Sequence, residues 1–224
     1  MAIVVLPQFG EITIPSWVND LESFRRWRFS GVLPEKLKVH FIQGEVWLDY
    51  DIEEAFTHNL VKTAVTAVLY QLTQADQSGL VFSDGMLVTN DDAGLSTEPD
   101  AMFISYAAIE AGRVKFTASA RGSGQATELI GSPDVVIEIV SPSSVDKDTE
   151  KLMSQYHDAR IPEYWLIDVR TDKVQFDIHR RTARGYSTTR ATAGWIKSRV
   201  FGKSFRLSRH VKTKKIATFT LDVQ

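Results

Sequence analysis

The chain of 224 residues contains no cysteine. This absence excludes disulfides, thiol catalysis and thiolate metal sites, and it leaves oxygen atoms and imidazole nitrogens as metal ligands. Hard divalent cations are therefore the natural candidates for any metal site.

Long apolar runs are also missing from the sequence. No run approaches the roughly 18 residues that span a bilayer, and the N-terminal MAIVVLPQFG lacks the basic start of a signal peptide. We therefore expect a cytoplasmic protein without membrane association. Because the chain has no repeat, low-complexity segment or linker, we expect residues 1–224 to form a single domain.

The formal net charge of −2 indicates no general attraction to nucleic acid, but it hides an asymmetry along the chain. From His179 to Lys215 there are 12 Lys and Arg residues and no Asp or Glu. This stretch has two interpretations: a solvated surface or a partner for acidic residues of the same fold, or a surface that binds a polyanion.

Local patterns in the first half predict a hairpin and a long helix. Residues 36–50 alternate apolar and polar side chains on both sides of Gln43-Gly44, which is typical of a β-hairpin. Asp51 and Glu54 resemble a capping box, and residues 60–72 carry apolar side chains at helical spacing. This pattern predicts a helix of about five turns.

The middle of the chain predicts a second hairpin and a loop. Residues 80–83 and 86–90 are strand-like and flank Asp84-Gly85, and residues 101–105 predict another strand. Residues 106–132 have little periodicity, which favours a short helix followed by a surface loop.

The second half predicts a buried strand, a helix and further strands. Residues 134–140 are apolar on both faces, as in the centre of a covered sheet. A helix capped by Ser143 or Ser144 follows, and then strands at 164–169 and 174–179.

Two carboxylates are candidates for a metal site. Glu138 lies in the middle of the apolar strand, where an unpaired charge would cost several kcal/mol. A salt bridge, a solvent-facing strand or a metal ion would each explain it. Asp100 follows Glu98-Pro99 just before a predicted strand, where turn chemistry is the alternative to a functional role.

The residues around these carboxylates are more ambiguous. A strand, short loop and helix place the first helical turns over the strand end, so Lys151 could approach Glu138. Lys147 lies on the same helical face, so periodicity does not choose between the two lysines, and a solvated helix face is the alternative. His58 could ligate a metal or form an ordinary hydrogen bond, and Glu45 could supply a further carboxylate.

A longer motif resembles a known family. Residues 131–143 read GSPDVVIEIVSPS, and they are followed by Lys151, Tyr156 and the EYWLID of residues 163–168. Together with Pro99-Asp100, this pattern resembles the Uma2 family, which is similar to the PD-(D/E)XK nuclease superfamily. The resemblance covers roughly residues 30–190.

The resemblance implies a fold and a site. The expected fold is an α/β restriction-endonuclease-like core with a central mixed β-sheet flanked by helices, preceded by an N-terminal β-hairpin region. Asp100 and Glu138 would bind Mg²⁺, for which Mn²⁺ could substitute, with the backbone carbonyl of Ile139 as a third ligand. The usual lysine position is Val140 here, so the resemblance assigns the catalytic lysine to Lys151 and adds Tyr156 to the site.

The implied activity is hydrolysis of DNA phosphodiester bonds, and the rival hypothesis is an inactive nuclease fold that binds nucleic acid or dimerises. DNA is the expected partner, and a homodimer is left open. Within the basic stretch, the residues expected to contact DNA are Arg180, Arg181, Arg184 and Arg190. The chain departs from the resemblance at Arg160, where relatives commonly have a glycine that closes the helix.

Overall fold

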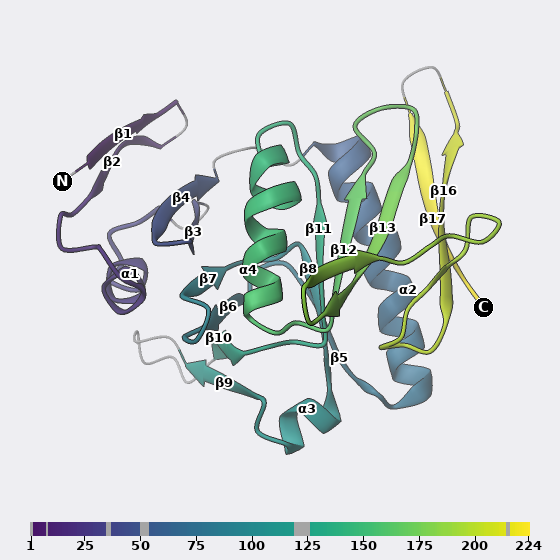
Figure 1. Cartoon of the computed structure of the whole chain (residues 1–224). Coiled ribbons are helices and arrows are strands. Elements are labelled where there is room, and N and C mark those ends of the chain that lie inside the picture. The colour runs from purple at the N-terminus through teal and green to yellow at the C-terminus, as the bar shows by residue number, and fades with distance from the viewer. Residues whose placement is uncertain (1, 8, 35–36, 50–53, 119–125, 214–215) are drawn as a thin grey trace.

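The structure is a computed structural model that describes residues 2–7, 9–34, 37–49, 54–118, 126–213 and 216–224. Figure 1 shows an α/β arrangement in which mixed β-sheets are flanked by helices. The expected fold class is therefore confirmed, although two six-stranded sheets take the place of one central sheet.

The first sheet, which we call the site sheet, contains the strand on which Glu138 lies. Its strands are, in spatial order, β14 (Gly185–Thr188), β13 (Gln175–Thr182), β12 (Glu163–Asp168), β11 (Val135–Ile139), β8 (Ala101–Ser105) and β5 (Gly79–Ser83). β11 and β12 are parallel, and the other neighbours are antiparallel.

The second six-stranded sheet, which we call the front sheet, includes the hairpin expected at residues 36–50. Its order is β4 (Glu45–Asp49), β3 (Lys38–Ile42), β7 (Leu95–Thr97), β6 (Leu87–Asn90), β10 (Ala126–Gly131) and β9 (Val114–Ala118). Two smaller sheets comprise β1 (Ala2–Leu6) with β2 (Gly10–Ile14), and β15 (Ile196–Lys197) with β16 (Ser204–Val211) and β17 (Ala217–Val223).

The helices are α1 (Leu21–Arg28), α2 (Leu60–Asp76), α3 (Tyr106–Glu110) and α4 (Leu152–Asp158). A π-helical turn directly precedes each of two helices: η1 (Ala55–Asn59) precedes α2, and η2 (Lys147–Lys151) precedes α4. Within the described ranges, no helix is long and apolar enough to cross a membrane.

Two apolar cores cover the two faces of the site sheet. Alternate residues of a strand point to opposite faces, and β11 follows this rule. Ile137 packs in one core with Val65 of α2 and side chains of the β15–β17 sheet. Val136 packs in the other core with Tyr156 of α4 and side chains of the front sheet. Glu138 shares the face of Val136, so it points toward α4 and the front sheet.

Several elements confirm the sequence-based predictions. The 36–50 hairpin is present as antiparallel β3 and β4, with positive φ angles at Gln43 and Gly44 in its turn. The long helix, the wholly buried β11 and the following helix and strands are also present. Asp51, expected to cap the first long helix, lies outside the described residues.

Two predictions were wrong. Asp84 and Gly85 do form a turn with positive φ angles, but β5 and β6 on either side of it belong to different sheets. Their pairing with β8, β7 and β10 outweighs the local hairpin signal. The loop expected after α3 contains strands β9 and β10, because pairing with distant β6 supplies the order that periodicity did not reveal.

Candidate functional site

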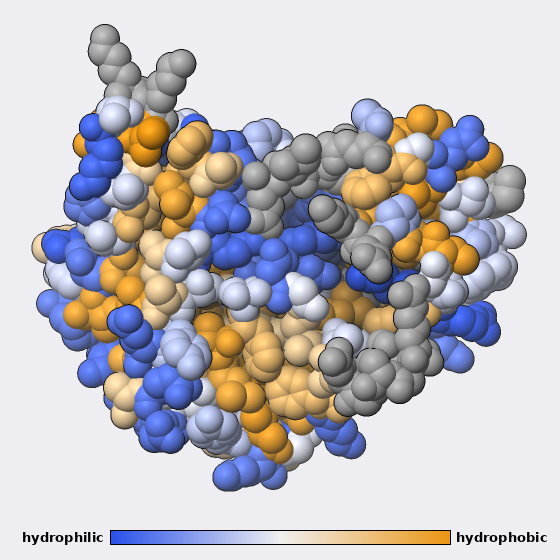
Figure 2. Space-filling model, turned by 180° about the vertical axis from the view of Figure 1, so that it is seen from behind, coloured by the Kyte–Doolittle hydropathy of each residue, from blue (hydrophilic) through white to orange (hydrophobic). Residues whose placement is uncertain are grey.

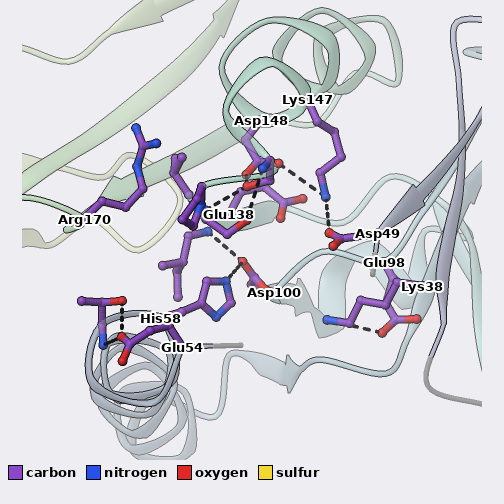
Figure 3. Close-up of a pocket in the computed structure, with 16 residues that line it drawn as sticks. Lys38, Asp49, Glu54, His58, Glu98, Asp100, Glu138, Lys147, Asp148 and Arg170 are labelled. Atoms are coloured by element: carbon purple, nitrogen blue, oxygen red, sulfur yellow. Dashed lines mark hydrogen bonds and ion pairs between the residues drawn. The ribbon is translucent and has the colours of Figure 1, made fainter. Parts of the chain in front are cut away.

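A cavity of about 270 Å³ opens at the C-terminal end of β11, between the site sheet, η1, η2 and the β3–β4 hairpin (Figure 3). Its ionisable lining residues are Lys38, Asp49, Glu54, His58, Glu98, Asp100, Glu138, Lys147, Asp148 and Arg170. Seen from behind, the upper centre of the molecule is hollowed and hydrophilic (Figure 2). We call this cavity the acidic pocket, because carboxylates predominate in its lining.

Strand register brings the two predicted carboxylates to this pocket. Ala101 of β8 pairs with Ile137 of β11 in an antiparallel register. Asp100, just before β8, therefore lies beside Glu138, and both line the acidic pocket.

Asp100 is a buried carboxylate with several donors. Its Oδ2 is 3.1 Å from Nε2 of His58 and accepts the backbone N–H of Ile139 at 2.8 Å, while Oδ1 is 3.4 Å from Nζ of Lys62. Burial alone would raise the pKa of Asp100, but the His58 hydrogen bond and the Lys62 charge lower it to about 2. Asp100 is therefore held as a carboxylate.

A second carboxylate, Asp84, binds two lysines near Asp100. Asp84 accepts hydrogen bonds from Nζ of Lys38 at 2.7 Å and from Nζ of Lys62 at 2.9 Å. Burial opposes ionisation, but these two lysines lower the pKa of Asp84. The turn at Asp84, which does not connect a hairpin, thus orients cations toward the site.

Glu138 is the most constrained acid of the pocket. Its side chain is 3% exposed, and its Oε1 accepts the hydroxyl of Tyr156 at 2.5 Å. Burial and the negative charges of Asp148 and Asp100 raise the pKa of Glu138 well above its usual value, against the opposing effects of Lys147 and Tyr156. This carboxyl group therefore lacks enough positive charge to ionise easily.

Lys147 and Asp148 complete the acidic pocket from η2. Nζ of Lys147 is 3.1 Å from Oδ2 of Asp49 and 3.6 Å from Oδ1 of Asp148. Burial would lower the pKa of Lys147, but Asp148, Glu138 and Asp49 raise it. The ammonium group is therefore charged and faces three carboxylates.

Asp148 has an unsatisfied oxygen. Oδ2 accepts the hydroxyl of Ser144 at 2.5 Å, whereas Oδ1 is buried and accepts no hydrogen bond from any part of the chain that the structure describes. Burial raises the pKa of Asp148 to about 6, even though Lys147 and Ser144 favour its ionised form. This oxygen lies 3.6 Å from the Lys147 ammonium but has no hydrogen-bond donor, so it suits a metal cation as a ligand.

The structure does not bring every sequence-predicted residue to the pocket. His58 and Ile139 line it, and Tyr156 reaches it through Glu138. Lys151 does not line it: Nζ of Lys151 instead donates to Oε1 of Gln43 at 3.1 Å. Glu45 is exposed at the start of β4, also outside the lining.

The four arginines of the basic stretch lie away from the pocket. Arg180 pairs with Glu163 at the start of β12, whereas the pocket is at the other end of that strand, roughly 17 Å away at the usual rise per residue. Nε of Arg181 donates to the carbonyl of His157. Arg184 and Arg190 are exposed in and after the β13–β14 hairpin.

Sequence reasoning missed three residues of the pocket, which are Asp49, Asp148 and Arg170. It also did not decide which of two lysines, Lys147 or Lys151, faces the pocket. Both lysines lie in η2, where bonds run from i to i+5. Both side chains reach the β3–β4 hairpin: Lys147 contacts Asp49 inside the pocket, and Lys151 contacts Gln43 outside it. The hairpin therefore separates the two lysines, and residue spacing carries no signal of this contact.

The oxygen ligands of the acidic pocket fit a hard divalent cation, but the protein side chains do not form a complete coordination shell. No three His, Asp or Glu side chains within the described part of the chain surround a common metal position. Mg²⁺ commonly uses one or two carboxylates and completes its shell with water and phosphate oxygens. Glu138, Asp148 and Asp100 are the residues that would hold it.

Arg160 occupies the position where the family pattern has a glycine after the helix. Its φ of 59° is left-handed, and its N–H donates to the carbonyl of His157. The position therefore has the left-handed backbone shape that favours glycine, and here an arginine occupies it.

Comparison with known proteins agrees with this architecture. A solved structure described as a "putative nuclease belonging to DUF820" from Anabaena variabilis superposes with a TM-score of 0.60 at 18% identity, covering 82% of this chain and 90% of that one. None of the curated proteins matches the chain. The family model Uma2, described as "Putative restriction endonuclease", matches residues 21–209. This match spans most of the sequence, including the pocket strands, and the chain therefore belongs to the Uma2 family.

Proposed function

We propose that the protein is a divalent-metal-dependent endonuclease that hydrolyses DNA phosphodiester bonds, with Mg²⁺ as its metal and Mn²⁺ as a substitute. One observation carries this proposal: Asp100 and Glu138 converge from neighbouring strands on one buried pocket. Family membership supports a nuclease fold and a nucleic acid substrate.

The electrostatics of the pocket support a cation there. Burial and the charges of Asp148 and Asp100 raise the pKa of Glu138. Burial and the charges of Asp100 and Asp49 raise the pKa of Asp148, and the Asp148 Oδ1 atom has no hydrogen-bond donor among the described residues. A bound divalent cation would supply the missing positive charge. It would polarise a phosphoryl oxygen and make a bound water more acidic.

The surrounding residues would orient these carboxylates and stabilise charge. His58, Lys62 and the Ile139 N–H hold Asp100 in its ionised form. Tyr156 fixes the rotamer of Glu138. We assign to Lys147 the charge-stabilising role that the sequence suggested for Lys151, because Lys147 lines the pocket and Lys151 does not.

The test is nicking of a supercoiled plasmid in Mg²⁺, with EDTA as the negative control. Glu138→Gln keeps an acceptor for Tyr156 and should lose roughly 100-fold or more in rate, and Asp100→Asn should do the same. Glu45→Gln is the matched control, since Glu45 is exposed outside the pocket. Thermal melts would establish that each variant is folded.

Wild-type rates in folded Glu138→Gln and Asp100→Asn would remove the acidic pocket from the mechanism. A wild-type protein that binds DNA but cuts none in either Mg²⁺ or Mn²⁺ would support the rival function, a nuclease fold used only for binding.

A further inference from the structure

Arg170 lines the acidic pocket with a partly exposed side chain that is held in one orientation. It follows β12, two residues after Asp168. Its Nε and Nη2 donate to the two carboxylate oxygens of Asp168 at 3.0 and 2.8 Å, and its backbone N–H donates to the same carboxylate. This forked contact fixes the plane of the guanidinium group.

The other cations of the pocket face inward. Lys147 contacts Asp49 and Asp148, and Lys38 contacts Asp84 and lies 3.9 Å from Glu98. Figure 3 shows Arg170 on the other side of Glu138 from these lysines. Their charges are therefore matched by carboxylates of the protein.

Arg170 is also paired with a carboxylate, but it differs from these lysines because its contact with Asp168 leaves N–H groups of the guanidinium unused. Its side chain is 34% exposed, and Nη1 has no acceptor within the described residues. A planar guanidinium with a fixed orientation and unused N–H groups is suited to a phosphate, which accepts two parallel hydrogen bonds.

We propose that Arg170 binds a backbone phosphate of the nucleic acid next to the bond to be cut, and that Asp168 is its positioning residue. The inference rests on the proposed function, because it places the strand across the mouth of the acidic pocket. It adds a specific contact, in which the Arg170 guanidinium binds the substrate outside the carboxylate cluster. Binding of the nucleic acid therefore does not require the metal ligands.

The experiment measures binding of a fluorescein-labelled duplex by anisotropy at several salt concentrations, in Ca²⁺ under conditions checked for absence of cleavage. Arg170→Gln should weaken binding roughly tenfold or more and should reduce the salt slope by about 0.9. Arg170→Lys keeps the charge but loses the fork, so it should restore the slope and recover affinity only in part.

Two further variants separate positioning from general charge. Asp168→Asn should weaken affinity without reducing the salt slope, since it removes the support of Arg170 and leaves the cation. Arg160→Gln is the matched control: Arg160 is exposed at the far end of α4, and Gln43 and Gln77 adopt the same positive φ in this chain. Its affinity and slope should equal those of the wild type.

The outcomes separate this inference from the proposed function. Unchanged affinity and slope in Arg170→Gln, with normal plasmid nicking by the wild type, would overturn the Arg170 assignment alone. Failure of the wild-type protein to bind the duplex at any salt concentration would overturn both.

Discussion

The hydroxyl of Tyr156 lies 2.5 Å from Oε1 of Glu138 and donates to it, and both side chains are buried. The two residues come from α4 and β11, so this bond joins the helix to the strand directly below the acidic pocket. The ring of Tyr156 also packs against Tyr164, whose hydroxyl donates to the carbonyl of Asp148. Two tyrosines thus support two of the acids.

Tyr156→Phe should lower the free energy of unfolding by about 1–3 kcal/mol, because it leaves a buried oxygen of Glu138 without its donor. Urea unfolding monitored by circular dichroism would measure this loss. Tyr70→Phe is the control, since Tyr70 is 57% exposed. Equal stabilities for the two variants would show that the Tyr156 hydroxyl contributes nothing to the fold.

Lys147→Ala should reduce Mg²⁺-dependent nicking by roughly 10²–10³-fold, because it removes the ammonium that faces Glu138 and Asp148. Lys151→Ala should stay near the wild-type rate, since the Lys151 ammonium contacts Gln43 outside the pocket. Plasmid nicking would compare the two, with thermal melts as the folding control. An inactive Lys151→Ala beside an active Lys147→Ala would reverse the assignment.

Stability should depend on pH in a way that Mg²⁺ modifies. The pKa of Asp148 is about 6 in the fold against an ordinary value of 3.8. The native state therefore binds more protons between these values, and the free energy of unfolding falls as pH rises through this interval. Glu138, whose pKa is also raised, adds to the fall at higher pH.

Mg²⁺ should consequently raise the melting temperature more at about pH 7.5 than at about pH 5.5, since a cation competes with protons for these carboxylates. Differential scanning fluorimetry with and without Mg²⁺ measures the difference, and Asp148→Asn should reduce it. An Mg²⁺ effect that is equal at both pH values would mean that the cation binds elsewhere.

The ends of the site sheet should contribute unequally to DNA binding. Arg209 contacts the Thr171 carbonyl and Asp172, which places the end of β16 beside the β12–β13 turn at the pocket end. Lys173 and Lys212 are exposed there. Replacing both with glutamine should flatten the salt slope by roughly 1.8.

The matched comparison is the Arg180→Gln and Arg184→Gln double variant, which removes two charges at the far end. We expect a smaller change in slope from this variant. A larger change, or a change of roughly three to four units when Arg181 and Arg190 are also replaced, would restore the DNA-contacting surface that the basic stretch suggested.

The sequence alone determined the elements whose signals are local. The apolar run around Glu138 can be stable only in a covered strand, and the Pro99-Asp100 start of β8 follows from proline geometry. These two signals marked Asp100 and Glu138 as candidates, and the resemblance to the Uma2 family joined them into a pair.

Only the tertiary structure decided which other residues join that pair. Asp49 comes from the front sheet, Asp84 from a turn between two sheets, and Lys62 from α2. The choice of Lys147 over Lys151 depends on where the β3–β4 hairpin packs against η2, because Lys147 meets Asp49 and Lys151 meets Gln43. Strand pairing and the packing of a hairpin on a helix are set by the whole chain, so residue spacing could not reveal them.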